Sequence, residues 1–483
     1  MSSNITIRNL LPDTDLICFL VCSLFTKEEC DNLLNAERKA SFQKAISNYP
    51  TYYRNNDRLV IDDSHLSAYL FDKIKSHLPD HIENWTLAEL NTRLRFCKYN
   101  ANQYFHRHLD GIHYVSTTKQ SKLTFMIYLN NAEEFEGGRT LFYKTKDSTE
   151  IWASYVPQQG DVMIFDHNLW HEGEEVTNGE KFVLRSDILY TKELEESSKE
   201  PFSGHLGYIW KILVFDNDTL LSAGRDKTIH VWNMNGDSRQ TLRGHQNSIL
   251  CMEKMNERTF ISGSRDKQMK IWKRNDNQMF ELINSFSVHS ATVLSICKVT
   301  KDFFASSAAD NSIKIVNLNG QIQHELIEHT NWVWQVVKLH DDCLASCSED
   351  QTIKIWDYKN DKCIRTFYDH CSVICLMYDQ VTNTLVSGNF QGEIMLRELS
   401  SDFNEIRTRK LDGHNGIVRT ILKVNETLLA SGGEDNKVKI WNIQSGICVQ
   451  EFQHDNFVQA LELTNDGKLL SASYDGTIKA WKI

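Results

Sequence analysis

The hydrophobic and polar positions of the first ninety or so residues have mostly helical spacing. One apolar run of ten residues, 16–25, is short enough to predict a buried strand. Thr26 and Glu29 directly after it form the pattern of a capping box, which starts a helix. Apolar residues at roughly helical spacing extend that predicted helix over 26–48, and a second helix is expected from about His65 to just before Pro79.

From Thr92 onward the apolar positions alternate with polar ones, a period that is typical of strands. The alternating segments are 94–99, 123–128, 162–165 and 182–188. Helices followed by several short antiparallel strands predict a double-sheet jelly roll, or double-stranded β-helix, with a helical buttress.

After a charged stretch at 193–200 the chain repeats itself seven times. A histidine recurs every 40–44 residues; a serine follows each one by 17 residues, and an aspartate follows by 21 residues in six of the seven repeats. A tryptophan comes six residues after the aspartate position in five repeats. Repeats of this length predict four-stranded propeller blades. The seven histidines are His205, His245, His289, His329, His370, His414 and His454.

On these marks residues 203–483 resemble the WD40 family. The resemblance implies a seven-bladed β-propeller in which a hydrogen-bonded His–Ser–Asp–Trp relay ties each blade together. Repeat three has Val316 at the tryptophan position, and repeat five has Gln391 and Arg397 at the aspartate and tryptophan positions, so these two blades are expected to be locally weaker. Because the chain ends in the third strand of the last blade, residues from about 194 to 203 are expected to supply its outer strand and close the ring. The predicted protein is therefore mainly β, with domains at 1–192 and 193–483.

Composition narrows the class of protein. Hydrophobic residues make up 41% and charged residues 24% of the 483 positions, as in soluble globular chains. The net charge of −11 argues against nucleic acid as the main partner. The apolar run at 16–25 is too short for a membrane span. The 12 cysteines are scattered without the paired spacing of a zinc site, which favours small buried side chains in a reducing, cytoplasmic setting.

The candidate chemistry lies in the first domain. His108-Leu-Asp110 is followed 63 residues later by His171. Along a strand, His108 and Asp110 share one face, and two imidazoles with one carboxylate form the facial triad that holds non-haem Fe(II). His106 shares that face, but it has no carboxylate two residues on, so it is expected outside the ligand set. His113 and His167 are expected to be solvated or hydrogen-bonded loop residues.

Two basic residues follow the second histidine. Lys181 and Arg185 are four positions apart, so they face the same way along a strand. One of them can hold the distal carboxylate of a dicarboxylate co-substrate, and the other can hold a second carboxylate or the substrate. Asp187 shares their face and can instead neutralise Arg185.

Residues 15–192 resemble the Fe(II)- and 2-oxoglutarate-dependent dioxygenases, in particular the prolyl 4-hydroxylase-like branch. The resemblance implies that His108, Asp110 and His171 bind the catalytic Fe(II), that Lys181 and Tyr99 hold the distal carboxylate of 2-oxoglutarate, and that Arg185 supports cofactor binding. O2 is then the co-substrate, and ascorbate is a further cofactor. The segments that carry the resemblance are Thr26–Cys30, Arg95–Tyr99, His108–Asp110, Gly137–Thr140, Gly160–Phe165 and His171–Gly173.

The expected function is hydroxylation of a peptidyl residue such as proline, with the propeller recruiting the protein or peptide substrate or a scaffold. Two alternatives stay open: an interaction protein with a weak or regulatory oxygenase domain, and a hydroxylase of a small molecule. Arg54, Asn55 and Asn56 lie in a loop rich in hydrogen-bonding groups, which makes them candidates for substrate contact or members of a plain surface turn.

The propeller has a candidate partner face of its own. In WD40 units the residues three and five after the repeat histidine, and the residue before the aspartate, point to one rim of the channel. Aromatic and arginine side chains gather at those positions, and both are common interface hot spots, although some of them can simply fill blade surfaces. They include Tyr208, Trp210, Arg225, Arg265, Trp332, Trp334, Glu349, Arg419, Phe457 and Tyr474.

Overall fold

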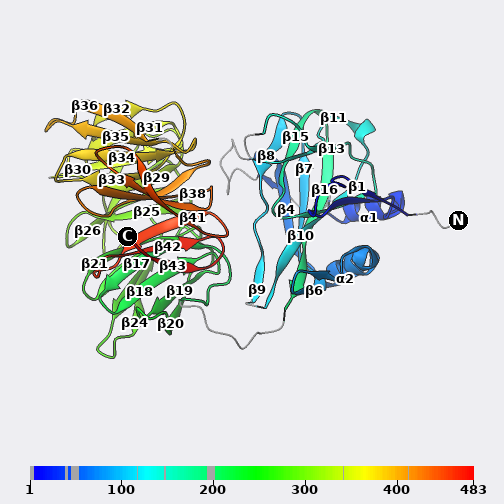
Figure 1. Ribbon diagram of the computed structural model, residues 1–483, viewed down its shortest axis with the longest axis horizontal. Coiled ribbons are helices and arrows are strands. Elements are labelled where there is room, and N and C mark those ends of the chain that lie inside the picture. The colour runs from blue at the N-terminus through cyan, green and yellow to red at the C-terminus, as the bar shows by residue number, and fades with distance from the viewer. Residues whose placement is uncertain are drawn as a thin grey trace. The chain divides into compact units, whose positions relative to one another are not determined.

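The computed structural model describes residues 5–37, 42–44, 54–116, 118–145, 148–192, 202–340, 342–411 and 413–483. The chain forms two compact units, Met1–Glu196 and Ser197–Ile483, and both are built mainly from antiparallel strands (Figure 1). The exact boundary predicted at 192/193 adjoins residues 193–201, which lie outside the described ranges. Within those ranges no helix is both long and apolar enough to cross a membrane.

The first unit contains a large sheet and a small sheet. The order of the large sheet is β1 (Thr6–Asn9), β2 (Cys18–Cys22), β14 (Val162–Asp166), β10 (Lys119–Tyr128), β16 (Lys181–Thr191), β7 (Arg93–Tyr99), β4 (Asp57–Asp62) and β3 (Gln43–Lys44), with β5 (His81–Ile82), β6 (Trp85–Leu90) and β9 (Tyr114–Ser116) paired off this path. The order of the small sheet is β11 (Phe135–Gly137), β15 (Trp170–Gly179), β12 (Thr140–Tyr143) and β13 (Ala153–Tyr155), with β8 (Gln103–His108) paired to β15.

The strand alternation sorts side chains onto the two faces of the large sheet. On β16, Leu184 packs into a cluster with the helices, whereas its neighbour Val183 packs with Phe105 and Phe142 of the small sheet. Residues of β16 with the parity of Val183, which include Lys181 and Arg185, therefore point into the space between the sheets. The double-sheet jelly roll is confirmed.

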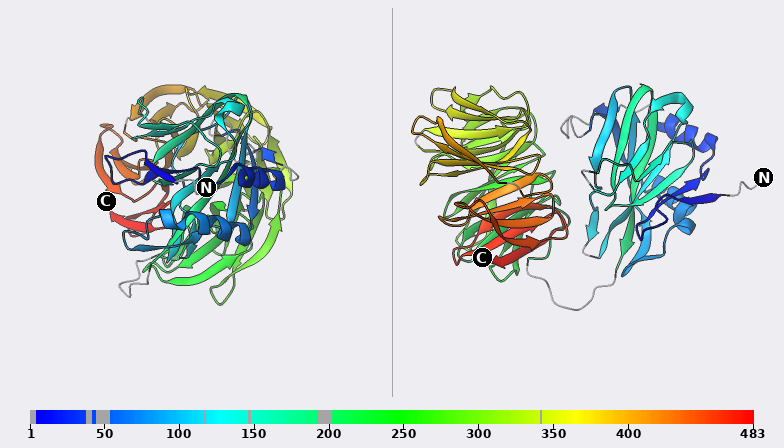
Figure 2. Two further views of the ribbon diagram at one scale, coloured as in Figure 1. Left: turned by 90° about the vertical axis from the view of Figure 1, so that its right-hand side faces the viewer. Right: turned by 45° about the horizontal axis from the view of Figure 1, so that its top comes forward.

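Two helices of the described residues cover the other face of the large sheet. They are α1 (Lys27–Glu37) and α2 (Ser64–Ile74), followed by short 3-10 turns at Lys75–His77 and Ala132–Glu134. Both helices lie on the same side of the sheet (Figures 1 and 2), where Cys30 and Leu70 join its core. Thr26 and Glu29 form the predicted capping box, with the Glu29 amide 3.2 Å from Thr26 Oγ1. The helix predicted over 26–48 was too long, because it ends at Glu37 and Gln43–Lys44 pairs with β4.

The second unit is the predicted propeller. Six antiparallel sheets have four strands each: β17 (Ile209–Asp216), β18 (Thr219–Gly224), β19 (Thr228–Trp232) and β20 (Ser238–Arg243); β21 (Ile249–Asn256), β22 (Thr259–Ser264), β23 (Met269–Arg274) and β24 (Phe280–Phe286); β25 (Val293–Lys298), β26 (Phe303–Ala308), β27 (Ile313–Asn317) and β28 (Ile322–Leu326); β29 (Val333–Lys338), β30 (Cys343–Ser348), β31 (Thr352–Asp357) and β32 (Lys362–Tyr368); β33 (Val373–Asp379), β34 (Thr384–Asn389), β35 (Ile394–Leu399) and β36 (Glu405–Leu411); and β37 (Val418–Lys423), β38 (Leu428–Gly433), β39 (Lys437–Asn442) and β40 (Cys448–Gln453). The seventh sheet has β41 (Val458–Leu463), β42 (Lys468–Ser473) and β43 (Ile478–Lys482).

The first strands of successive sheets lie next to one another, and β41 of the last sheet contacts β17 of the first, so the seven blades form a closed ring. The strand predicted at about 194–203 falls almost wholly on residues outside the described ranges. At its end, Phe202 packs against Trp232 of the first blade, with ring centroids 6.1 Å apart.

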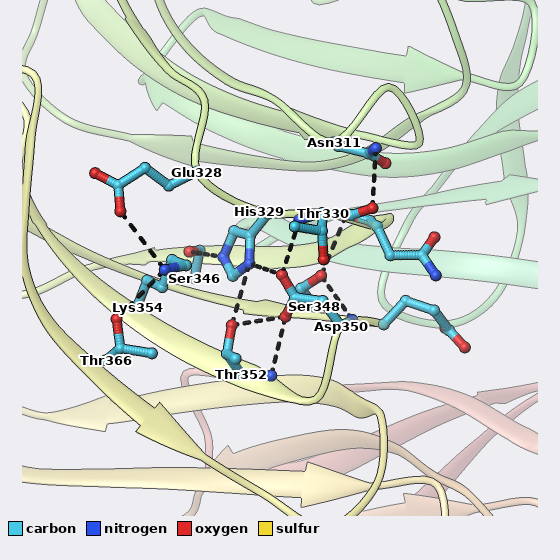
Figure 3. Close-up of polar contacts among 12 residues, drawn as sticks. Asn311, Glu328, His329, Thr330, Ser346, Ser348, Asp350, Thr352, Lys354 and Thr366 are labelled. Atoms are coloured by element: carbon cyan, nitrogen blue, oxygen red, sulfur yellow. Dashed lines mark hydrogen bonds and ion pairs between the residues drawn. The ribbon is translucent and has the colours of Figure 1, made fainter.

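The predicted relay ties the blades internally. In blade four, His329 Nε2 lies 2.7 Å from Ser346 Oγ, and its Nδ1 lies 2.7 Å from Asp350 Oδ2 (Figure 3). Trp356 Nε1 donates to the same serine oxygen at 2.8 Å. The serine hydroxyl then donates to His329 Nε2, which leaves the Nδ1 hydrogen for the aspartate. Blades one, two, six and seven repeat these contacts, and blade three repeats them without a tryptophan, since the buried Val316 takes its place.

Candidate metal centre

His108 and His171 lie side by side on neighbouring strands of the small sheet. His108 ends β8, His171 lies near the start of β15, and the two are register partners. Cross-strand partners project from the same face of a sheet, and the two ring centroids are 4.2 Å apart. Asp110, two residues beyond β8, brings its carboxylate oxygens within 3.5 Å of His108 Nε2 and 3.6 Å of His171 Nε2. The structure thus brings together the three residues predicted from the sequence.

Backbone carbonyl groups orient both imidazole rings. His108 Nδ1 donates to His106 O at 2.6 Å, and His171 Nδ1 donates to Leu169 O at 2.9 Å. A carbonyl oxygen can only accept, so the hydrogen is on Nδ1 and the Nε2 lone pair faces Asp110. Burial lowers the pKa of His108 and brings the pKa of His171 down to about 3, so both rings are neutral. Metal-bound histidines are held in this way.

Asp110 is held from the large sheet. Thr124 Oγ1 on β10 donates to Asp110 Oδ2 at 2.5 Å, and the Arg185 guanidinium on β16 forms an ion pair with the same carboxylate. Burial alone would raise the pKa of Asp110, but the charge of Arg185 and the nearby imidazoles hold it well below its ordinary value. An ionised carboxylate and two neutral imidazoles, with ligand atoms within 4.8 Å of one another, form a donor set that fits Fe(II).

Lys181 is buried between the sheets beside this cluster. It pairs in register with Tyr99 on β7, and its Nζ lies 5.5 Å from the centre of the Tyr99 ring. The Tyr99 hydroxyl in turn lies 3.9 Å from the position that a Cβ on Gly173 would take, two residues after His171. Lys181 Nζ donates to the carbonyl of Gly138 at 2.6 Å. Within the described residues the ammonium forms no ion pair with a carboxylate.

Arg185 and Asp187 have separate partners. Arg185 pairs with Asp110, as described above, whereas both terminal nitrogens of Arg95 lie 3.0 Å from Asp187 Oδ2. Asp187 therefore forms its direct ion pair with Arg95, and the charge on Arg185 lies next to a candidate metal ligand.

The loop proposed for substrate contact is largely engaged within the fold. Asn55 Oδ1 accepts from the Tyr104 amide at 2.8 Å, and Asn55 Nδ2 donates to Asn102 O. Asn56 is fully buried and accepts from Arg54 Nε at 2.9 Å. The Arg54 guanidinium lies 3.9 Å from the centre of the Phe105 ring, which stacks on His108 at 3.6 Å. Of the three, Arg54 is connected to the centre through one aromatic ring.

Sequence reasoning missed three residues near the centre. Thr124 lies on the inward face of β10, where only its parity could have identified it. Phe105 stacks on His108 although the two residues differ in parity along β8, because the register of β8 with β15 is irregular there. His167 was expected to be a solvated or hydrogen-bonded loop residue, but it is buried, and neither ring nitrogen has a hydrogen-bond partner among the described residues. Burial lowers the pKa of His167, while Asp187 and Asp110 act in the opposite direction.

On the propeller, the predicted face residues form two aromatic groups. Tyr208 of blade one stacks on Tyr474 of blade seven at 4.0 Å, and Trp210 and Phe457 lie 5.1 and 5.4 Å from the Tyr474 ring. In blade four, Trp332 and Trp334 lie 5.5 Å apart, and Trp334 Nε1 donates to Glu349 at 2.7 Å. Arg225 covers the Tyr208 ring and Arg419 pairs with Glu434, whereas the Arg265 backbone amide donates to Ser248 O.

Comparison with known families assigns both units. Residues 94–186 match the model of the 2OG-Fe(II) oxygenase superfamily. Residues 196–233, 236–273, 405–442 and 446–482 match the WD domain, G-beta repeat, and residues 329–398 match the TEP-1 C-terminal beta-propeller. The oxygenase match contains all three residues of the cluster together with Lys181 and Tyr99.

Similar curated proteins include several with WD repeats. The DENN domain and WD repeat-containing protein SCD1 of Arabidopsis thaliana is 28% identical over 170 residues, which are 34% of this chain and 14% of that protein. The ribosome biogenesis protein YTM1 of Saccharomyces cerevisiae is 24% identical over 328 residues, 58% of this chain and 67% of that protein. Apoptotic protease-activating factor 1 of Homo sapiens is 26% identical over 231 residues, 38% of this chain and 18% of that protein. The chain thus spans a small part of the first and third of these relatives.

Proposed function

Because the chain joins a 2OG-Fe(II) oxygenase domain to WD40 repeats, we propose that it is a dioxygenase that hydroxylates a peptidyl residue, such as proline, on a protein partner bound by the propeller. We propose that His108, Asp110 and His171 hold Fe(II), and that Lys181 and Tyr99 hold the distal carboxylate of 2-oxoglutarate.

The buried Lys181 ammonium carries this proposal. A lone buried charge is costly unless a counter-charge is present for at least part of the working cycle. Burial already lowers the pKa of Lys181 to about 8. A dicarboxylate with one end at the metal would bring its other carboxylate towards this ammonium and towards the Tyr99 hydroxyl. The lysine thereby distinguishes a 2-oxoglutarate site from a general metal site.

The protein's own side chains position and desolvate the reactants. Bound Fe(II) supplies the redox chemistry in which 2-oxoglutarate and O2 yield succinate and CO2 while a substrate C–H becomes C–OH. The His106 and Leu169 carbonyls fix the two imidazoles with Nε2 towards the metal position. Thr124 and Arg185 keep Asp110 ionised and oriented. Phe105 and Phe165 pack against the two imidazoles and exclude water from one side.

The direct test is formation of succinate from 2-oxoglutarate by the full-length protein. We expect turnover with Fe(II), loss of turnover after chelation, and recovery when Fe(II) is returned. In parallel, 2-oxoglutarate should raise the unfolding midpoint only when a divalent metal is bound. A protein that shows neither metal-dependent turnover nor metal-dependent stabilisation by 2-oxoglutarate is not an oxygenase of this kind.

Replacing Lys181 with methionine should raise the KM for 2-oxoglutarate by about 10- to 100-fold, the value of a hydrogen bond to a charged group. Lys181→Arg retains the charge and serves as the matched control.

In the wild type, the Lys181 ammonium is charged below its pKa of about 8, so the affinity for 2-oxoglutarate should fall as the pH rises through 8. Steady-state measurement of KM from pH 6.5 to 9 checks both effects. An unchanged KM in Lys181→Met would assign the anchor elsewhere, with Arg185 next.

The partner site that we propose on the propeller is the aromatic group of blades one and seven. The rings of Tyr208 and Tyr474 stack at 4.0 Å, and Trp210 and Phe457 lie 5.1 and 5.4 Å from the Tyr474 ring. Groups of aromatic rings on one face are typical of interface hot spots. Capture of protein partners by the wild type, followed by mass spectrometry for an added oxygen, would test whether the bound partner is the substrate.

We also propose a reducing, cytoplasmic setting, supported by the free thiols of all 12 cysteines. We also propose ascorbate as a further cofactor, which would return oxidised iron to Fe(II). Comparing how long turnover lasts with and without ascorbate checks this.

A further inference from the structure

Blade five departs from the relay at a specific place. In the other six blades the repeat histidine is buried, with Nε2 on the serine and Nδ1 on the aspartate. In blade five, Arg397 occupies the tryptophan position and its Nη1 donates to Ser387 Oγ at 2.7 Å. His370 lies instead at the surface, where its side chain is 55% exposed. The repeat has kept the histidine but not its structural role.

The His370 imidazole lies among side chains of the kinds that bind metals. His370 Nδ1 is 3.0 Å from Asp369 Oδ1, and Nε2 is 3.0 Å from Glu393 Oε2 and 3.1 Å from Gln391 Oε1. One ligand atom each from Asp369, His370 and Cys371 lies within 4.8 Å of the others. This group is separate from the oxygenase centre and includes a sulfur atom, which that centre lacks.

Both carboxylates are held in place by further contacts. The Asp369 side chain is 4% exposed. Its Oδ2 lies 3.4 Å from Arg397 Nη2, and its Oδ1 accepts from the His370 amide at 2.8 Å. Glu393 accepts from Asn389 Nδ2 at 2.8 Å and lies 2.6 Å from Lys410 Nζ. A fixed carboxylate on the far nitrogen of a histidine is the usual outer-shell support of a metal site.

We propose that Asp369, His370 and Cys371 bind a thiophilic divalent cation of the Zn2+ class, with His370 ligating through Nδ1 and donating its Nε2 hydrogen to Glu393. One sulfur, one nitrogen and one oxygen ligand suit such an ion, and water completes a tetrahedral set. On binding, the Cys371 S–H bond breaks, the sulfur–metal bond forms, and the proton passes to solvent. The ion would tie the loop before β33 together where the relay is missing.

The competing arrangement is a protonated His370 in ion pairs with Asp369 and Glu393 and no metal. The two can be separated because only a metal site uses the Cys371 sulfur. Co2+ is a suitable probe, since cobalt bound by a thiolate absorbs in the near ultraviolet through sulfur-to-metal charge transfer. The oxygenase centre offers only nitrogen and oxygen donors and gives no such band.

The experiment is titration of the full-length, metal-free protein with Co2+. We expect a charge-transfer band that saturates at one equivalent for this site, disappears in Cys371→Ser and is retained in Cys448→Ser, a half-buried cysteine of another blade. Glu393→Gln should retain the band but weaken cobalt affinity by about 10- to 100-fold, as loss of an outer-shell partner does. The melting curve of Cys371→Ser without metal should match that of the wild type, because Cys371 is only half-buried.

A titration that gives no charge-transfer band would overturn the proposal in favour of the ion-paired imidazolium. A band that persists in Cys371→Ser would also overturn it, since the sulfur ligand would then be another cysteine. If a variant melts differently without metal, His370→Gln provides the independent check: loss of the band with normal melting supports the site, and retention contradicts it.

Discussion

Replacing His108 with alanine should reduce Fe(II)-dependent formation of succinate by more than about 100-fold, whereas replacing His106 with alanine should change it little. The two histidines are two residues apart on β8 and share the same parity. Only His108 is within 3.5 Å of Asp110 and in register with His171. Loss of an outer-shell partner costs 10- to 100-fold in metal affinity or activity, so loss of a ligand should exceed that range.

The contribution of His106 to the site comes from its backbone. Its carbonyl accepts the His108 Nδ1 hydrogen, and an alanine at position 106 retains that carbonyl. Its ring lies 4.3 Å from Tyr104, outside the ligand cluster. Bound iron per chain, measured after anaerobic gel filtration, should fall in His108→Ala and stay at the wild-type value in His106→Ala. Equal losses in the two variants would contradict the assignment of the ligand on β8.

Residue parity made part of the centre predictable from sequence, although it failed on β8, where His106 is exposed and His108 is buried. Alternation along strands correctly placed Lys181 and Arg185 on one face, and the His-x-Asp spacing placed His108 beside Asp110. Partners that come from distant strands were not predictable. Arg185 pairs with Asp110, whereas Asp187 pairs with Arg95, which lies 90 residues before Arg185. No local sequence pattern encodes the position of Arg95. The burial of His167 depends on the same tertiary packing.

The repeats were predictable for a different reason. Seven copies of one spacing specify the blades and the relay, because each copy has to satisfy the same buried polar atoms. The substitutions in repeat five were visible in the sequence, but their consequence was not. Whether Arg397 would reach Ser387, and where His370 would then go, depends on side-chain lengths and on Asp369 in the folded blade.

Replacing Ser346 with alanine should lower the free energy of unfolding of the propeller by about 4 kcal/mol. The fully buried hydroxyl contacts His329 Nε2 at 2.7 Å (Figure 3). It also accepts a hydrogen bond from Trp356 Nε1 at 2.8 Å. Its removal leaves two buried polar atoms without a partner, at about 1–3 kcal/mol each. A water molecule cannot take the place of the hydroxyl, because the change to alanine removes one oxygen atom and leaves too little room.

Ser306→Ala in blade three is the matched control. There the equivalent hydroxyl lies 2.9 Å from His289 Nε2 and 3.4 Å from the Lys314 carbonyl oxygen, and Val316 stands where the indole would be. His289 Nε2 is the atom that loses a close partner, so the expected cost is about 2 kcal/mol. Urea unfolding followed by circular dichroism measures both variants in the same transition. The difference of about 2 kcal/mol would be the contribution of the Trp356 N–H contact, and equal losses would mean that the tryptophan stabilises the blade by packing rather than through its hydrogen bond to the serine.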